Sequence, residues 1–563
     1  MKSRSLFVLA LAAVMLLTVG VPTSLAAVSP LGEFPIVDEP ITLTYYREGA
    51  PTEQNLIELG ENNVLKYIRD VTNINMEFVF VNSSEGKQKI SLDFAADVYP
   101  DGALLDWATL FNQTDIMQYG AKEGILVPLN DMIDEYGNEI IKIFELRPNF
   151  KPVITAPDGN IYGLPRASEC FHCMSYPKLW INIEWLEKLG LDEPQTTEEL
   201  YEVLKAFKEN DPNGNGLADE IALTGSVDYS CAAEYWLMNS FIDTAASSAP
   251  GNPRHFLSWI NDQVTFVADK PEWKQGLEYC KMLFDEGLID PANFSQNAEG
   301  LQLQARSDPD VNTVGAYVCD HMGMGVEWTP ANAAAYHALL PVEGPNGVRF
   351  QSYVDQIAQI AGFQFAIFDK CANKEAMFRL ADFFYSEDYL PIAHYGIEGV
   401  TWRRPDDPNA LNIKGGPLKW VPIQQSSNAT EDELYERRIN SFWMPIMGDL
   451  LERRDMWSPA ATPETLLTNY ETYLDYETQK TTKYWPEVTL PRSLFMESDR
   501  ADEFSVLKLN ISNHVLNNTS MFITGARSLD EWDAYVNELN QYGLEDYIRI
   551  YTEEYAKFIE KLQ

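Results

Sequence analysis

The chain has 563 residues, with 42 Lys and Arg against 84 Asp and Glu, so its formal net charge is −42 at pH 7. Single hydrophobic cores stop growing near roughly 250–300 residues, so we expect two or more lobes. Hydrophobic residues make up 45% of the chain, which is enough to form a packed core and excludes a disordered protein. The excess of acidic groups makes nucleic acid and anionic membranes poor partners, because both are themselves negatively charged.

Residues 1–27 have the three parts of a secretory signal peptide. Lys2 and Arg4 precede an unbroken apolar run from Leu6 to Leu17, and small residues surround the expected cleavage point near Ala26. A spanning helix needs about 20 apolar residues, so this run is short for a membrane anchor, which is the alternative. Cleavage would remove two basic groups and no acidic one. We therefore expect a soluble exported protein, extracellular, cell-surface or periplasmic, with no cysteine near the cleavage point to carry a lipid.

An extended linker, residues 28–40, leads into a predicted strand at 41–46, where β-branched and apolar residues alternate. A helical pattern at 63–71 and a second strand at 74–81 complete a β-α-β beginning. Residues 100–107 then predict a turn and a short buried strand, whose last residues would lie at the carboxyl edge of the sheet.

Two later helices show clear start signals. Thr196 and Glu199 have the spacing of a capping box, and the apolar residues that follow share one helical face. Ser528 and Glu531 repeat that spacing before a helix that Gly543 would close. Another helix is predicted at 373–384, so strands and helices alternate early and helices dominate late. The apolar faces of the two capped helices are Leu200, Val203, Leu204 and Phe207, and Trp532, Tyr535, Val536 and Leu539.

The segment 211–220, between the first capped helix and a strand at 221–224, is a candidate calcium loop. Oxygen-bearing side chains stand at its positions 1, 3 and 5, a glycine at position 6 permits a sharp turn, and position 7 offers a carbonyl. Position 12 is Ala222 and not the Glu of an EF-hand, so two acids near the end of the loop must complete the shell. We predict structural Ca²⁺, with an ordinary Asn-Gly turn as the alternative. The ligands would be Asp211, Asn213, Asn215, the Leu217 carbonyl, Asp219 and Glu220.

The six cysteines are an even number in a chain expected to be exported, so disulfides can form, but their connectivity stays open. Cys170-Phe-His-Cys173 has the spacing of a redox or zinc pair, and no second pair stands at a matching distance to complete four ligands. We therefore treat a metal or redox site there as the weaker alternative. The other cysteines are Cys231, Cys280, Cys319 and Cys371.

Familiar catalytic motifs are absent from the sequence, which has no H-E-x-x-H, no G-x-S-x-G and no phosphate-binding loop. Ser175 and Lys178 match S-x-x-K without the motifs that accompany it in penicillin-binding proteins, so we read the match as coincidence. The absence of motifs does not exclude a glycosidase, because its two carboxylates need not be close in sequence.

Aromatic residues are abundant, with 13 Trp, 28 Tyr and 27 Phe. Several fall at predicted strand ends or in Gly- and Pro-rich loops, where a large ring has less core to fill. A ring face combined with carboxylate and amide acceptors suits a sugar, although plain packing is an equal alternative for any one of them. These residues are Tyr45, Tyr46, Trp107, Trp328, Tyr395, Trp402 and Trp443.

Several short motifs stand in a distinctive order along the mature chain. They are Pro35–Thr44, Asp158–Pro165, Asp211–Gly216, Tyr395–Gly399, Phe522–Gly525 and Leu529–Val536. This ordered set resembles the family 1 extracellular solute-binding proteins of ABC importers, in particular the alginate-oligosaccharide-binding and LplA-type branch. The resemblance implies a type II periplasmic-binding-protein-like α/β fold, in which two lobes of discontinuous segments are joined by hinges and extra helices lie at the C-terminus.

On this resemblance, the predicted lobe 1 comprises residues 41–165 and 362–432. The predicted lobe 2 comprises 170–357 and 433–563 and carries the calcium loop. The first hinge would fall near 162–180 and the second near 358–365. Sugar would be held between the lobes and ligand would close the hinge.

The resemblance also implies a function as the binding component of an ABC importer. The protein would be a non-catalytic monomer that captures an oligosaccharide and delivers it to the transmembrane subunits of the permease. The candidate sugar contacts are Arg47, Trp107, Trp328, Tyr395, Glu398 and Trp402. Unlike LplA-type proteins, this chain has no lipidated cysteine at its mature N-terminus, and its scattered basic residues favour a neutral sugar over a uronate. The alternatives are a secreted glycoside hydrolase or polysaccharide lyase, and a sugar-sensing partner of a membrane receptor.

Overall fold

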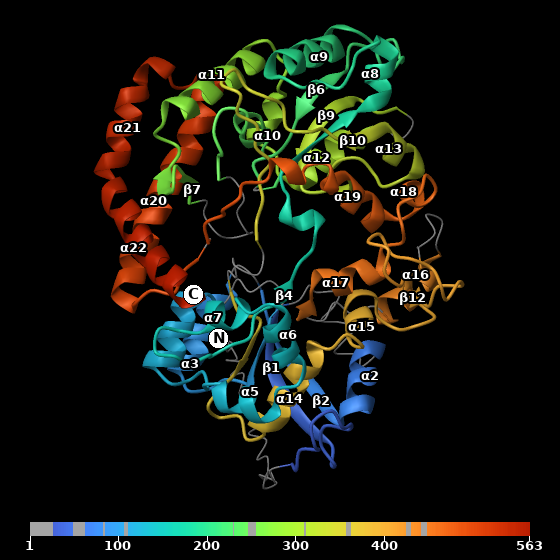
Figure 1. Cartoon of the computed structure of the whole chain (residues 1–563), viewed down its shortest axis with the longest axis vertical. Helices are drawn as coiled ribbons and strands as arrows, with labels where there is room; N and C mark the ends of the chain where they lie inside the picture. Colours follow the sequence, from blue (N-terminus) through green and yellow to red (C-terminus); the bar gives the residue numbers. More distant parts are fainter. Residues whose placement is uncertain are drawn as a thin grey trace, which may run out of the picture.

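The computed structural model describes residues 26–48, 62–82, 85–105, 111–228, 230–245, 255–308, 311–355, 362–423, 430–440, 447–491 and 493–563. Two lobes lie one above the other, and several segments of the chain pass between them (Figure 1). Each lobe has its own sheet and its own core of buried apolar side chains. Among the described residues, no helix is both long enough and apolar enough to cross a bilayer.

A four-stranded sheet organises lobe 1. Its strands, in sheet order, are β11 (Phe365–Ile367), β3 (Gly102–Leu104), β1 (Ile41–Glu48) and β2 (Ile74–Val81). β1 and β2 run parallel over their full length, with Ile41 opposite Ile74. β3 is parallel to β1, and β11 is antiparallel to β3. The predicted β-α-β beginning is therefore confirmed, and a strand from a distant part of the sequence completes the sheet.

The helix between β1 and β2 is α2 (Asn63–Thr72). The side chain of Asn62 accepts a hydrogen bond from the Leu65 backbone N–H at 3.0 Å, so a free donor of the first turn is satisfied. Asn73 ends the helix in a left-handed conformation, with φ of +58°. The other helices of lobe 1 are α3 (Gly86–Ala95), α4 (Gln113–Ile116), a π-helix (Met117–Lys122), α5 (Asn130–Tyr136), α6 (Glu139–Leu146), α7 (Phe150–Ile154), α14 (Lys374–Phe384) and α15 (Leu390–Tyr395).

Lobe 2 has a second four-stranded sheet. Its strands, in sheet order, are β10 (Tyr336–Ala338), β5 (Lys178–Asn182), β9 (Val314–Cys319) and β6 (Ile221–Thr224). β6 and β9 run parallel, with Thr224 opposite Tyr317, while β5 is antiparallel to both of its neighbours. The carboxyl ends of β6 and β9 consequently share one edge of the sheet.

The capped helix predicted after residue 196 is α9 (Thr197–Glu209). Thr196 accepts a hydrogen bond from the Glu199 backbone N–H at 3.2 Å, and the four apolar residues of the predicted face are buried against lobe 2. The other helices of this lobe are α8 (Ile183–Leu189), α10 (Ala233–Met238), α11 (Pro271–Asp285), α12 (Ala298–Ala305) and α13 (Pro330–Ala335), and a hairpin joins β7 (Leu257–Ile260) to β8 (Gln263–Phe266).

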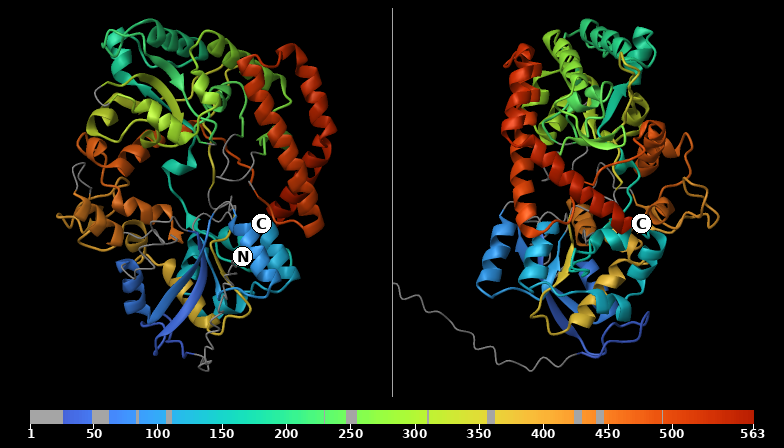
Figure 2. Two further views of the ribbon diagram at one scale, coloured as in Figure 1. Left: turned by 180° about the vertical axis from the view of Figure 1, so that it is seen from behind. Right: turned by 60° about the vertical axis from the view of Figure 1, so that its left-hand side comes forward.

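Three helices at the C-terminus, α20 (Ser498–Thr524), α21 (Trp532–Gln541) and α22 (Leu544–Leu562), flank lobe 2 (Figure 2). Ser528 caps the short 3-10 turn before α21, and Gly543 ends that region with φ of +85°, as predicted. The end of α22 reaches lobe 1, where Phe558 packs against the cores of both lobes. Residues of α7 and α22 line opposite sides of a groove of about 400 Å³ at this junction.

Short elements occupy the region between the two sheets. On the lobe 1 side are β4 (Ala167–Ser168), β12 (Trp402–Arg403), β13 (Val421–Pro422), α16 (Glu431–Asn440), β14 (Gly448–Asp449) and α17 (Leu451–Arg454). α18 (Thr465–Thr468) and α19 (Tyr470–Gln479) lie on the lobe 2 side.

Three crossovers between the lobes can be placed from the described residues. The first crossover follows β4 and precedes β5, within the predicted hinge at 162–180. The second lies between Val354, whose backbone N–H donates to the Met174 carbonyl, and Phe363 in lobe 1. Of the predicted hinge at 358–365, residues 358–361 lie outside the described residues. The third follows Ala460, whereas we predicted the return to lobe 2 at residue 433. Trp457 still belongs to the core of lobe 1. The sequence does not reveal this boundary, because the short elements before it pack through contacts that leave no periodic pattern.

Candidate functional site

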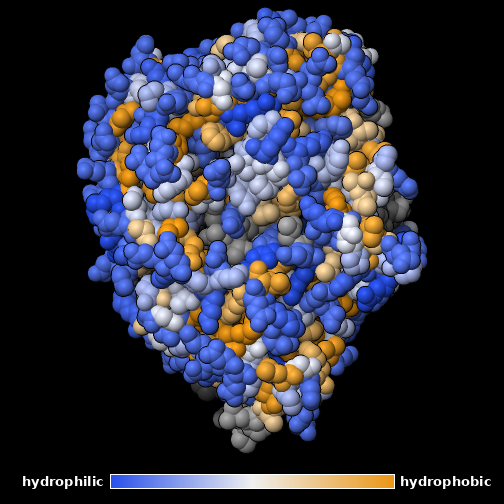
Figure 3. Space-filling view, in the orientation of Figure 1, coloured by the Kyte–Doolittle hydropathy of each residue, from blue (hydrophilic) through white to orange (hydrophobic). Residues whose placement is uncertain are grey.

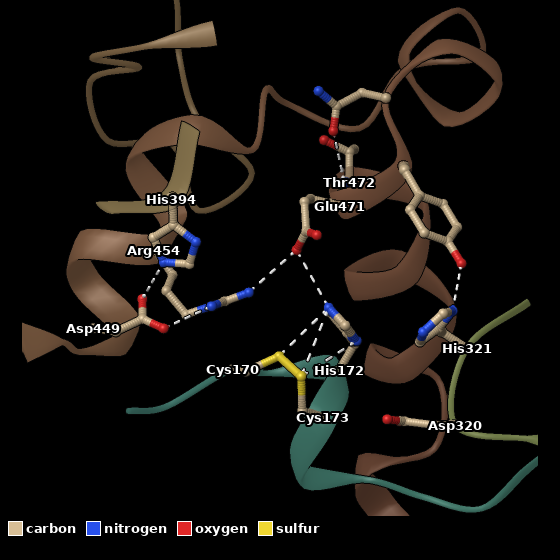
Figure 4. Close-up of polar contacts among 12 residues, drawn as sticks. Cys170, His172, Cys173, Asp320, His321, His394, Asp449, Arg454, Glu471 and Thr472 are labelled. Carbon is tan, nitrogen blue, oxygen red and sulfur yellow. Dashed lines mark hydrogen bonds and ion pairs between the residues drawn. A yellow bond between two sulfur atoms is a disulfide. The ribbon is translucent and has the colours of Figure 1, made fainter. Parts of the chain in front are cut away.

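Charged side chains from four separate segments of the chain gather between the two lobes (Figure 4). Glu471, in the first turn of α19, lies between His172 of the first crossover and Arg454 of α17. Its Oε2 atom is 3.3 Å from His172 Nε2 and 3.3 Å from Arg454 Nη2. Arg454 Nη1 is 2.8 Å from Asp449 Oδ2 in β14. An ion pair between Arg454 and Glu471 therefore bridges the lobe 1 and lobe 2 sides of the third crossover.

Asp449 is the buried centre of this cluster. Its carboxylate also accepts hydrogen bonds from Arg166 at 2.7 Å and Ser168 at 3.1 Å, and His394 Nε2 lies 3.4 Å away. Strand pairing of β14 with β4 brings these groups together. Burial opposes the charge of Asp449, but Arg454, His394 and Arg166 together hold its pKa well below its usual range. The cluster is therefore a set of mutually compensating charges around one fully buried carboxylate.

Two carboxyl groups of α19, those of Glu471 and Asp475, have pKa values shifted in opposite directions. Burial works against the ionisation of both, yet His172, Arg454 and His394 lower the pKa of Glu471 to about 2. At Asp475, one turn further along, burial is supported by the neighbouring charges of Glu471 and Asp455, and the pKa rises to about 7. One helix thus carries a firmly ionised carboxylate and a carboxyl that titrates near neutral pH.

The two cysteines with the spacing of a redox or zinc pair lie at this cluster and are joined by a disulfide bond. Cys170 and Cys173 form a disulfide, and His172 Nε2 is 3.4 Å from the Cys170 sulfur. Cys170, His172 and Cys173 form the one close group of three or more His, Cys, Asp or Glu ligand atoms found among the described residues. Since the two sulfurs are bonded to each other, the group does not offer two thiolates to a metal in this state.

A buried lysine fastens the first crossover to lobe 2. Lys178 begins β5, and its ammonium donates hydrogen bonds to the carbonyls of His172 at 2.8 Å, of Ser175, and of Asp320 at 3.4 Å. Burial lowers the pKa of Lys178 to about 8, and Asp320 and Asp475 partly oppose this. Ser175 and Lys178, which match S-x-x-K, therefore meet through a backbone carbonyl, in a contact that positions the chain.

Aromatic rings from three segments stack beside the charges. Trp485 stacks on Tyr353 with ring centroids 4.2 Å apart and contacts Phe171 at 5.8 Å, and its Nε1 donates to Ser175 at 3.2 Å. The Lys414 ammonium lies 4.7 Å from the Phe171 ring centroid. Since Phe171 and Tyr353 belong to the first and second crossovers, the rings hold the crossovers together.

The lobe 2 side of the cluster carries a second aromatic group. The Tyr470 hydroxyl lies 2.7 Å from His321 Nδ1 and accepts the Gly323 backbone N–H. Trp328 is half-buried and packs against Tyr470 and Tyr473, with centroids 4.7 Å and 5.2 Å away. At mid-height, between the lobes, the molecular surface is hollowed (Figure 3).

The structure separates the predicted sugar contacts by exposure. Arg47 is buried near the end of β1, with Nη1 3.5 Å from the Leu104 carbonyl, and Trp402 is only 2% exposed and donates to the Gly396 carbonyl at 2.9 Å. Tyr395 is half-buried beside Trp457. Glu398 is exposed and pairs with Arg404 at 3.2 Å. Trp107 lies outside the described residues.

These positions fall into separate groups. Tyr395 ends α15, Glu398 lies in the loop that follows, and Trp402 begins β12. Arg47 lies in the lobe 1 sheet, and Trp328 lies on lobe 2. Sequence reasoning did not select the charged cluster itself. The members of the cluster are scattered along the chain, and 299 positions separate His172 from Glu471. The one local feature in the sequence that involves a member of the cluster is the Arg453-Arg454 pair, which stands out in an acid-rich chain.

The predicted calcium loop connects α9 to β6, and the side-chain oxygens of its acidic residues accept hydrogen bonds from other residues of the loop. Asp211 accepts the backbone N–H groups of Gly214 at 2.8 Å and Gly216 at 2.9 Å. The side-chain amides of Asn213 and Asn215 both point to Asp219, at 3.1 Å and 3.0 Å. Gly214 and Gly216 have φ of +78° and +77°, which side chains rarely adopt, so glycine fits this tight turn.

Glu220 provides a test of whether a cation fits this loop. It is 2% exposed, and its Oε1 atom is buried with no hydrogen-bond partner among the described residues. Burial, followed by the neighbouring Asp219 and Asp211, raises the pKa of Glu220. A divalent cation would satisfy the unpartnered oxygen and relieve the repulsion among three carboxylates. The donor set, made of carboxylate, amide and carbonyl oxygens, is the set that Ca²⁺ prefers.

Comparison with known proteins places the chain among exported binding proteins. The family described as bacterial extracellular solute-binding protein matches residues 51–390. The fructooligosaccharide ABC transporter substrate-binding protein FusA of Streptococcus pneumoniae serotype 4 (strain ATCC BAA-334 / TIGR4) is 26% identical over 546 residues, which cover 93% of this chain and 92% of FusA.

Solved structures of these proteins share the fold. Two S. pneumoniae FusA structures, one with kestose and one of an EF-hand mutant with fructo-nystose, are each 24% identical with a TM-score of 0.73, over 92% of this chain and 100% of theirs. The alginate-binding protein AlgQ2 without calcium ion is 20% identical with a TM-score of 0.63, over 92% of this chain and 99% of its own. The two-lobe, type II periplasmic-binding-protein-like fold predicted from the sequence is thereby confirmed.

Proposed function

Because the chain belongs to the bacterial extracellular solute-binding protein family, we propose that it captures an oligosaccharide between its lobes for an ABC importer and catalyses no reaction. The observation that carries this proposal is the meeting of three crossovers at one charged cluster between two lobes with separate cores. FusA, which aligns along almost the whole chain, is a fructooligosaccharide-binding component of such an importer.

Capture would be a shift between open and closed arrangements of the lobes. Each lobe has its own packed core, so the crossovers are where the backbone can change direction. The sugar favours the closed arrangement only as far as it contacts both lobes better there. The Arg454–Glu471 ion pair spans the third crossover, so it lies where this motion is concentrated.

The sugar contacts would combine half-buried rings with an exposed acid. Trp328 on lobe 2 and Tyr395 on lobe 1 offer ring faces, and Glu398 offers acceptors for hydroxyl groups. Arg47 and Trp402 are buried in this arrangement, so we assign them to holding the strand end and the loop. Trp107 remains a predicted contact.

The charge of the cluster favours a neutral sugar. Arg166 and Arg454 are already compensated by Asp449, and Arg454 also pairs with Glu471. A uronate would therefore have to compete with buried carboxylates for these guanidinium groups, at a desolvation cost.

The 211–220 loop would hold structural Ca²⁺. Asp211, Asn213, Asn215, the Leu217 carbonyl, Asp219 and Glu220 are the oxygen donors. Bound Ca²⁺ would supply positive charge that compensates Asp211, Asp219 and Glu220. The loop lies between α9 and β6, so its role would be to stabilise lobe 2 and not to contact the sugar.

We further assign the protein to the outer side of the cytoplasmic membrane, as a monomer that presents its closed form to the transmembrane permease subunits. The apolar run at 6–17 is the export signal on this view.

The test uses the purified mature chain and a panel of neutral and uronate oligosaccharides. We expect calorimetric binding of a neutral oligosaccharide, with a smaller radius of gyration by X-ray scattering and no product by chromatography. Trp328→Ala should weaken that binding, whereas Tyr542→Ala, a change at an exposed tyrosine on the C-terminal helices, should not. Steady release of cleaved sugar, or the absence of both binding and compaction across the panel, would refute the proposal.

A further inference from the structure

Two buried cysteines outside the charged cluster approach each other closely. The sulfur atoms of Cys231 and Cys319 are 3.1 Å apart, although 88 positions separate them in the sequence. Both residues are 0% exposed. A disulfide bond measures about 2.0 Å between sulfurs, so a movement of about 1 Å would bring these atoms to bonding distance.

The backbone brings the two residues together without help from the sulfurs. Cys319 is the last residue of β9, and Cys231 lies in the loop that leaves the adjacent strand β6. The loop folds back because the Ser226 backbone N–H bonds to the Cys231 carbonyl at 2.8 Å. Asn293 holds the next residues, since its Oδ1 accepts the Ala233 N–H at 3.3 Å. The pair is thus aligned by strand order and by the loop itself.

We propose that Cys231 and Cys319 form a second disulfide in the exported protein. Their two thiols would lose two protons and two electrons to an external disulfide. The S–S bond of that oxidant breaks to give two thiols while the Cys231–Cys319 bond forms.

Burial determines when this bond can form and how it resists reduction. Neither sulfur is accessible in the folded lobe, so exchange with an oxidant must occur while lobe 2 is still folding. Once formed, the bond would be shielded from reductants. The Cys170–Cys173 disulfide is less protected, because Cys173 is only half-buried. The two disulfides should therefore differ sharply in their susceptibility to reduction.

The bond would fix the edge of lobe 2 that adjoins the crossovers. Cys319 lies opposite Lys178 in the β5–β9 pairing, and the next carbonyl, of Asp320, accepts from the Lys178 ammonium. Lys178 also binds the His172 carbonyl beside the other disulfide. A Cys231–Cys319 bond would therefore tie the loop after β6 to the strand end on which the first crossover is anchored.

The experiment counts thiols in the full mature chain. The protein is refolded with oxidised and reduced glutathione, unfolded in guanidinium without further reductant, and alkylated with N-ethylmaleimide before intact mass analysis. Two adducts are expected, from Cys280 and Cys371, and peptide mapping should recover the Cys231–Cys319 crosslink. Four adducts would overturn the proposal, since all four unpaired cysteines would then be free.

Two comparisons separate this bond from a general effect of cysteine loss. Cys231→Ser should raise the adduct count from two to three by releasing Cys319, whereas Cys280→Ser should lower it to one. Native protein treated with a phosphine reductant should open Cys170–Cys173 first, and equal opening of both pairs would contradict the burial argument. The melting temperature should fall by roughly 5 °C or more in Cys231→Ser, relative to Cys371→Ser. These readouts do not depend on which sugar the protein binds.

Discussion

Replacement of Asp475 by Asn should stabilise the protein at pH 8, and this gain in stability should shrink as the pH falls to 5. Burial and the nearby Glu471 and Asp455 raise the Asp475 pKa to about 7 from an ordinary 3.8. A carboxyl with a raised folded-state pKa contributes stability below its ordinary pKa, and this contribution is lost as the pH rises through the folded value. Asp475 therefore destabilises the folded protein progressively between about pH 4 and pH 8.

The size of the effect follows from the shift. One pKa unit corresponds to about 1.4 kcal/mol, so a shift of about three units sets a ceiling of about 4 kcal/mol on the gain from removing the charge. The Asn amide is itself polar and buried, which offsets part of that gain. We expect Asp475→Asn to be about 1–3 kcal/mol more stable than the wild type at pH 8. Because the charge of Asp475 is lost gradually as the pH falls towards 4, this difference should decrease by about 2–3 kcal/mol between pH 8 and pH 5.

Urea denaturation at the two pH values, followed by tryptophan fluorescence, measures this difference. Glu471→Gln, one turn earlier on α19, is the matched control with the opposite sign. The Glu471 pKa is lowered to about 2, so its stabilising contribution is complete above its ordinary value of 4.5 and is lost only as the pH falls towards 2. The control should thus be less stable at both pH values. Equal destabilisation by Asp475→Asn at pH 5 and pH 8 would refute the reasoning.

Three further predictions address the rest of the site. Asp449→Asn should lower the free energy of unfolding by about 3–5 kcal/mol in urea denaturation at pH 7, because it removes the buried carboxylate that pairs with both Arg166 and Arg454. Asp546→Asn, at an exposed ion pair, should change it by less than about 1 kcal/mol, and equal losses would contradict the buried network. Calcium removal by a chelator should lower the melting temperature by about 5 °C, and Asp211→Asn should abolish that response. An unchanged melting temperature in the presence of the chelator would show that the loop is an ordinary turn. Trp328→Ala should weaken sugar binding about tenfold by calorimetry with the fold intact by circular dichroism, and unchanged affinity would remove this ring from the site.

The elements that could be predicted are those whose signals are local. The strand at 74–81 and the helix after Thr196 follow from alternation, capping and a repeating apolar face within a few residues. The signal of the 211–220 loop is equally local, because its candidate donors lie within ten consecutive positions, and its binding of Ca²⁺ stays a prediction. Such patterns depend on backbone geometry alone and do not require knowledge of the fold.

The charged cluster could not be predicted, because folding assembles it from distant residues. His172 and Glu471 are neighbours only because the first crossover passes beside α19. Trp402 shows the converse problem. Its place in a Gly-rich loop indicates an exposed ring, but the loop closes on itself and the indole N–H bonds to the Gly396 carbonyl, so the ring is buried.

The junction between α22 and lobe 1 constrains the direction in which the protein can open. Because the partly buried Phe558 packs against both cores while the crossovers connect the lobes elsewhere, the lobes are in contact at two separated places. If both contacts persist, relative rotation is confined to an axis through them, and a wide symmetric separation would first require the C-terminal helix to detach. Entry of a sugar would then be asymmetric, from the side away from that axis, and truncation before Phe558 should widen the range of inter-lobe angles in solution.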